Sequence, residues 1–98
     1  MKAVHVVVSG RVTGVGFRVG VKNEADKLGI VGWVRNRKSR PTFLGKGKVE
    51  AVFSGESGAV DAIVTWCSKG SLFAAVDKIE IKKVSPKDGL KGFTLLKN

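Results

Sequence analysis

A glycine-rich stretch that ends on an arginine is the first feature of the chain that could perform chemistry. It covers residues 9–18, reads S-G-R-V-T-G-V-G-F-R and holds three glycines within seven residues. Strand-forming residues precede it and a helix-like segment follows it, so its backbone N–H groups and the helix N-terminus can converge on negative charge. Glycine also lets a ligand approach the backbone closely. A glycine-rich turn that only reverses the chain is the alternative.

The common phosphate and metal signatures do not fit the chain. The dinucleotide pattern G-x-G-x-x-G, started at Gly14, requires a glycine where the chain has Val19, and no G-x-x-x-x-G-K-[ST] frame exists. HExxH, Cys/His metal spacing, a G-x-S-x-G elbow and a convincing carboxylate pair are also missing. We therefore expect no metal and no cofactor.

A second candidate is Asn36, at the end of the strand-like segment 30–36. At a strand end a polar side chain can project from a rigid element into a site. The alternative is an asparagine that merely starts a turn.

The two stretches together resemble the paired signature of the acylphosphatases, small enzymes that hydrolyse the carboxyl-phosphate bond. The halves are G-R-V-T-G-V-G-F-R at residues 10–18 and G-W-V-R-N at residues 32–36, and the similarity extends over nearly the whole chain. The resemblance implies that Arg18 holds the phosphate and that Asn36 orients the attacking water.

Such residues suit a bond that breaks easily. An acyl phosphate is a mixed anhydride whose carboxylate leaves without being protonated, so its hydrolysis needs mainly charge neutralisation and a positioned water. Arg18 offers a planar fork for two phosphate oxygens. Asn36 can hydrogen-bond the water, whose proton can pass to the substrate's own phosphate. The predicted catalytic residues are Arg18 and Asn36, and the predicted phosphate-binding residues are Thr13, Gly14, Val15, Gly16, Phe17 and Arg18.

The chain departs from the family at three places. Thr13 stands where the family often has glutamine, and Val19-Gly20 stands where it usually carries a bulky residue; Gly20 also costs about 1 kcal/mol of helix stability relative to alanine. Residues 37–48 run longer than the family's usual Asp-Gly turn and carry five positive charges and no negative ones. They form either a solvated loop or an electrostatic guide for a polyanionic ligand.

The elements that must position the site follow the order β-α-β-β-α-β with a short terminal strand. This order predicts an α+β, ferredoxin-like split βαβ sandwich, an antiparallel sheet with two helices on one face. Alternation and helical periodicity place strands at residues 4–8, 30–36, 49–54, 76–84 and 93–96. They place one helix at residues 19–28 and a second one between a Ser57 cap and an end at Lys69-Gly70.

Finer details follow from the same patterns. Val4, Val6 and Val8 share one face of the first strand, Ser57 is expected to cap the second helix and Gly29 to end the first. The only histidine, His5, and the only cysteine, Cys67, have no matching catalytic partners in the sequence. We expect His5 to be structural and Cys67 to be a small core residue.

Length and charge set the remaining bounds. Residues 1–98 are expected to form a single domain and a monomer. The single cysteine fits a cytoplasmic protein, and no apolar run is long enough for a signal peptide or a membrane span. The formal net charge of +10 favours anionic partners, for which an acyl phosphate and its product inorganic phosphate are our first choice.

Two other functions compete with hydrolysis. A basic ferredoxin-like module could bind nucleic acid, although the chain has no tyrosine and K-G-F at residues 91–93 does not continue as an RNA-recognition motif. A catalytically silent domain could instead use the cradle to sense phosphate or carbamoyl phosphate.

Overall fold

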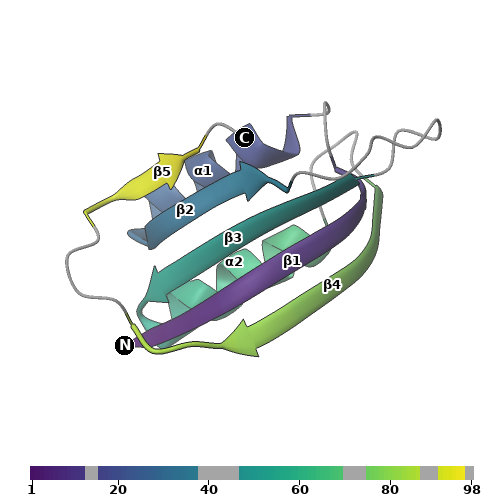
Figure 1. Ribbon diagram of the computed structural model, residues 1–98. Helices are drawn as coiled ribbons and strands as arrows, with labels where there is room; N and C mark the ends of the chain where they lie inside the picture. The colour runs from purple at the N-terminus through teal and green to yellow at the C-terminus, as the bar shows by residue number, and fades with distance from the viewer. Residues whose placement is uncertain (13–15, 38–46, 70–74, 87–90, 97–98) are drawn as a thin grey trace.

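The described residues fold into one five-stranded sheet with two helices on one of its faces (Figure 1). The computed structural model describes residues 1–12, 16–37, 47–69, 75–86 and 91–96. Residues Thr13, Gly14 and Val15 of the predicted cradle, and most of the basic insertion, therefore lie outside the described residues. In chain order the elements are β1 (Lys2–Arg11), α1 (Phe17–Leu28), β2 (Val31–Asn36), β3 (Gly47–Gly55), α2 (Ser57–Lys69), β4 (Ala75–Lys83) and β5 (Phe93–Leu95).

The strand order β4-β1-β3-β2-β5 and the one-sided helices confirm the predicted ferredoxin-like α+β fold. One detail of the prediction is wrong, because the sheet is mixed: β5 pairs with β2 in parallel, while the other neighbouring strands are antiparallel. In Figure 1, β4 ends and β5 begins at the same end of the sheet. β5 therefore runs in the opposite direction to β4. Since β2 also runs opposite to β4, β5 and β2 are parallel.

The core lies between the sheet and the helices. Val4, Val6 and Val8, which were predicted to share one face of β1, are all buried and belong to this core. The periodic stripe of each helix faces them, because residues four apart fall on one side of a helix. The buried helical residues are Phe17, Val21 and Ala25 of α1, and Val60, Ile63 and Cys67 of α2.

The end of α1 matches the sequence signal, whereas both helix starts differ from the prediction. α1 begins at Phe17, two residues before the predicted Val19, so Phe17 and Arg18 of the predicted cradle lie in its first turn. Gly29 closes α1 as predicted, with φ of 68° and its N–H directed at the carbonyls of Ala25 and Asp26. Ser57, predicted to cap α2, is instead its first helical residue. The first helical hydrogen bond runs from the Val60 N–H to the Glu56 carbonyl over 2.9 Å, which makes Glu56 the capping position.

Cys67 is a core residue, as predicted: it is 1% exposed, and burial raises the pKa of its thiol to about 12. We expect Cys67→Ala to lower the free energy of unfolding by about 1 kcal/mol through lost buried volume, and to leave turnover by the folded protein unchanged. Denaturant titration and initial rates would measure the two effects. Rapid alkylation of the native thiol with loss of activity would contradict this role.

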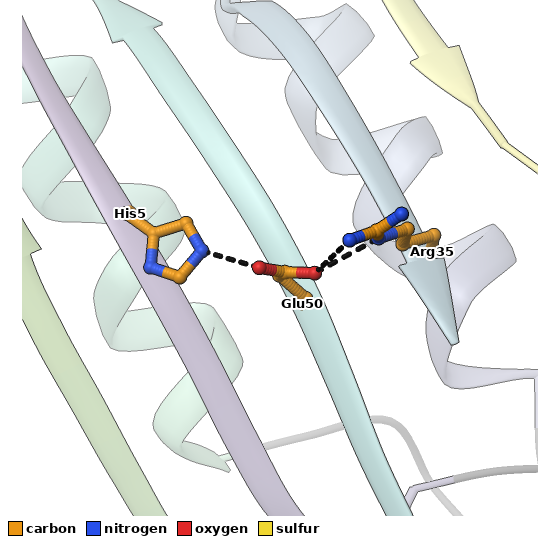
Figure 2. Close-up of polar contacts among 3 residues, drawn as sticks. All are labelled: His5, Arg35 and Glu50. Carbon is orange, nitrogen blue, oxygen red and sulfur yellow. Dashed lines mark hydrogen bonds and ion pairs between the residues drawn. The ribbon is translucent and has the colours of Figure 1, made fainter. Parts of the chain in front are cut away.

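The face of the sheet away from the helices carries a polar cluster from its three middle strands (Figure 2). His5 on β1 contacts Glu50 on β3, with Nε2 and Oε2 2.6 Å apart. Arg35 on β2 donates from Nε and Nη2 to Oε1 of Glu50 over 2.8 and 2.7 Å, and its guanidinium lies 5.3 Å from the centre of the Trp33 ring. His5 is thus bound to a structural carboxylate.

This cluster makes stability depend on pH. Burial by itself raises the pKa of Glu50, but hydrogen bonds from His5 and Arg35, with the charge of Arg35, outweigh it and hold that pKa below its ordinary value of 4.5. Because the folded pKa is the lower one, the carboxylate stabilises the fold above pH 4.5 and loses this contribution as the pH falls through the folded pKa.

We expect Glu50→Gln to lower the free energy of unfolding at pH 7 by about 1–2 kcal/mol, the usual size for a lost hydrogen bond to a charged group. Urea titrations at pH 7 and pH 3 would measure it, and the difference from the unaltered protein should shrink at the lower pH. Glu80→Gln, which breaks an exposed pair with Lys78, is the matched control and should change little. An equal loss at both pH values would refute the electrostatic origin.

Candidate active site

Arg18 and Asn36 line the same pocket, which has a volume of about 190 Å³. Arg18 is the second residue of α1 and Asn36 is the last residue of β2. Two further predicted residues, Gly16 and Phe17, also line it. The complete lining is Val12, Gly16, Phe17, Arg18, Val19 and Asn36.

The pairing of β2 with β3 places Asn36 on the helix-covered side of the sheet. Asn36 pairs with Val49, and two residues earlier the buried Val34 pairs with Ala51. Side chains two apart share a face, so Asn36 continues the inner row of β2. Gly32 starts this row with φ of 141°, where a β carbon would lie 1.9 Å from the Val52 carbonyl oxygen. The strand pairing therefore requires the glycine of G-W-V-R-N.

The first turn of α1 presents positive potential to the pocket. Gly16 occupies the N-cap with φ of 76°, no side chain caps the helix, and its first turn has no acidic residue. A helix N-terminus carries a partial positive charge and amide hydrogens that helical bonding does not use. An anion in the pocket would meet both these amides and the guanidinium of Arg18.

A backbone carbonyl near the C-terminal end holds Arg18. Its Nη1 donates to the carbonyl oxygen of Leu96 over 2.8 Å, and the Leu96 N–H donates to the Val34 carbonyl over 2.8 Å. The segment after β5 therefore ties the arginine of α1 to β2, the strand that carries Asn36. Nothing in the sequence could indicate this contact, because a backbone carbonyl is present at every residue.

The side-chain oxygen of Asn36 is a buried acceptor that none of the described residues satisfies. Its Oδ1 is buried and has no hydrogen-bond partner among the described residues. An unpaired buried acceptor usually costs about 1–3 kcal/mol, so such atoms are rare outside functional sites. This acceptor can take a hydrogen bond from a water or a substrate hydroxyl.

The chemical groups of the described lining are few. Among its described residues there is no carboxylate, imidazole, thiol or amine. The described part of the chain also holds no group of three His, Cys, Asp or Glu side chains that could bind a metal ion. What the pocket can supply is a guanidinium, amide hydrogens and a carboxamide.

Two lining residues were not among the predicted site residues. Val12, the residue after β1, is 1% exposed, and Val19, in the first turn of α1, is 52% exposed. Their type carried no chemical signal, although each is near the predicted cradle in sequence. Two hollows of about 280 and 350 Å³ elsewhere on the molecule are larger, but neither includes Arg18 or Asn36.

No helix within the described residues is long and apolar enough to cross a membrane.

Comparison with known proteins gives one consistent result. The family model described as acylphosphatase matches residues 4–95. A curated acylphosphatase of Rubrobacter xylanophilus is 47% identical over 94% of this chain and 77% of its own length, and one of Roseiflexus sp. is 41% identical over 98% and 96%. The crystal structure of acylphosphatase from Bacillus subtilis superposes with a TM-score of 0.86 at 34% identity, covering 98% of this chain and 99% of that one.

Proposed function

The chain belongs to the acylphosphatase family and is an acylphosphatase hydrolase, and we propose that the pocket between α1 and the end of β2 is its active site. There it splits the carboxyl-phosphate bond of an acyl phosphate into a carboxylate and inorganic phosphate. This proposal rests on one observation: Arg18 of α1 and Asn36 of β2 line the same pocket.

Arg18 binds the phosphate in this proposal. One of its five N–H donors is used by Leu96, which leaves donors for two phosphate oxygens. The amides at the start of α1 and the predicted cradle residues Thr13, Gly14, Val15, Gly16 and Phe17 would add donors around the same phosphate. These donors neutralise the charge that the phosphoryl group carries as the bond to the carboxylate breaks.

Asn36 orients the water. Its unpaired Oδ1 accepts a hydrogen bond from the water and directs the oxygen lone pair at phosphorus. The water oxygen forms the new P–O bond, the old P–O bond breaks with its electron pair going to the carboxylate, and the water proton passes to a phosphate oxygen. No side chain needs to change its protonation state, which suits the described lining residues, since none of them is a carboxylate, imidazole, thiol or amine.

We further propose the domain organisation, oligomeric state, location and partners of this enzyme. We take residues 1–98 as one domain, because the strands share one sheet, and as a monomeric enzyme. The donor types in the pocket support a metal-independent reaction, and the single buried cysteine supports a cytoplasmic location. The net charge of +10 favours anionic substrates. Nucleic acid is a less favoured partner. On the sheet face away from the helices, the carboxylate of Glu50 lies on the central strand and forms an ion pair with Arg35, which is then less available to a phosphate.

We expect the purified protein to hydrolyse benzoyl phosphate at a rate that is unaffected by a chelator and flat from about pH 5 to 8, because arginine and asparagine keep one protonation state over this range. Initial rates with and without EDTA, across that range, would measure it. His5→Gln should leave the profile unchanged. No hydrolysis, together with tight salt-dependent binding of an oligonucleotide, would overturn the proposed function.

A further inference from the structure

Phe17, the residue before Arg18, is held by an aromatic ring from the other helix. The rings of Phe17 on α1 and Trp66 on α2 stack with centroids 5.6 Å apart and planes 15° apart. Phe17 is 1% exposed and lines the pocket, whereas Trp66 does not line it. Trp66 is partly buried against the core, so its ring is supported from behind.

Gly20, one turn after Gly16 on α1, makes room for this indole. A β carbon at Gly20 would lie 2.7 Å from Cη2 and 3.1 Å from Cζ2 of Trp66. The backbone of Gly20 is helical, and its φ is not among the positive ones. Glycine weakens a helix relative to alanine, so conformation gives no reason for glycine here. The space taken by the indole does.

We propose that Trp66 is a positioning residue for the phosphate site. Its indole fits against the first turn of α1 at Gly20 and stacks on Phe17, which fixes the turn that carries Arg18 and the free amides. The inference rests on the proposed function and adds to it a residue that touches neither the substrate nor the water. A β carbon at Gly20 would push the Cη2 edge of the Trp66 indole aside. Because protein interiors are close-packed, the indole would then tilt against Phe17 and shift it.

The test is to add one methyl group at Gly20 and ask whether the loss depends on the indole. The variants are Gly20→Ala, Trp66→Phe, the double variant and Trp66→Ala, with Gly58→Ala as the matched control. Gly58 lies in the first turn of α2, and a β carbon there would meet nothing within 4 Å. Inorganic phosphate is titrated by calorimetry, benzoyl phosphate hydrolysis gives kcat and KM, and circular dichroism confirms that each variant is folded.

We expect Gly20→Ala to weaken phosphate binding and to lower kcat/KM by about fivefold, within the range of couplings between contacting residues. In the Trp66→Phe background the same substitution should change both values less than twofold, because the smaller ring leaves room for the methyl group. Trp66→Phe should keep most of the affinity, since a phenyl ring can still stack on Phe17, and Trp66→Ala should lose about tenfold or more. Gly58→Ala should raise the melting temperature and leave phosphate affinity unchanged.

The other outcomes contradict either the positioning role of Trp66 alone or the proposed site as well. If Gly20→Ala leaves phosphate affinity within twofold, or has the same effect with and without the indole, the inference is wrong while the proposed function stands. The same conclusion follows if folded Trp66→Ala loses thermal stability alone. If the unaltered protein does not bind phosphate, the proposed site fails and the inference fails with it. If Trp66→Ala does not fold, the comparison of Gly20→Ala in the two backgrounds decides.

Discussion

Replacing Arg18 with alanine is expected to weaken the binding of inorganic phosphate by at least tenfold and to lower kcat/KM for benzoyl phosphate by roughly 10³-fold or more. The guanidinium would meet the phosphate both in the ground state and in the transition state, so the substitution damages binding and turnover together. Calorimetric titration with phosphate beside initial rates would measure the two losses. Arg35→Ala is the matched control, since it removes the same charge from the opposite face of the sheet and should spare both values.

The geometry of Arg18 should matter as well as its charge. Lysine keeps the positive charge but loses the planar fork, and it cannot hold the Leu96 carbonyl and two phosphate oxygens in one plane. We expect Arg18→Lys to recover little of the activity that Arg18→Ala loses. Recovery to near the unaltered rate would show that only the charge is needed.

Replacing Asn36 with alanine is expected to separate binding from turnover. Its proposed partner is the water, so phosphate affinity should stay within about threefold while kcat falls roughly 10²-fold, the usual loss for one polar group used mainly in the transition state. The free energy of unfolding should stay level or rise, because the variant removes a buried acceptor without a partner among the described residues. Denaturant titration, calorimetry and initial rates measure the three quantities.

Asn23→Ala, an exposed position on α1, is the control for loss of an asparagine. Normal hydrolysis by Asn36→Ala, or a loss of phosphate binding as complete as that of Arg18→Ala, would show that the end of β2 has another role. A large fall in stability would show that the side chain is structural.

The order of the elements and the apolar stripes of the two helices could be predicted from the sequence. The sequence shows helical spacing around Val21 and Ile63 that matches burial, because the period brings apolar residues to one side, but its alternation around Val6 does not separate the two faces of β1, since Val7 is also buried. It also placed Gly29 at the end of α1 and Cys67 in the core, and the two glycine-containing signatures pointed to the family. Local periodicity and backbone demands are written in neighbouring residues, so these features needed no knowledge of the fold.

The groups that meet in the folded protein could not be predicted from the sequence. The parallel direction of β5, the Leu96 carbonyl on Arg18, the partner of His5 and the stacking of Trp66 beside Gly20 all join residues far apart in the chain. Every residue has a backbone carbonyl, so the sequence does not show which one contacts Arg18. A glycine in a helix likewise does not show which aromatic ring packs against it. Such contacts depend on strand register and on how two helices lie across one sheet, and these follow from packing of the whole chain.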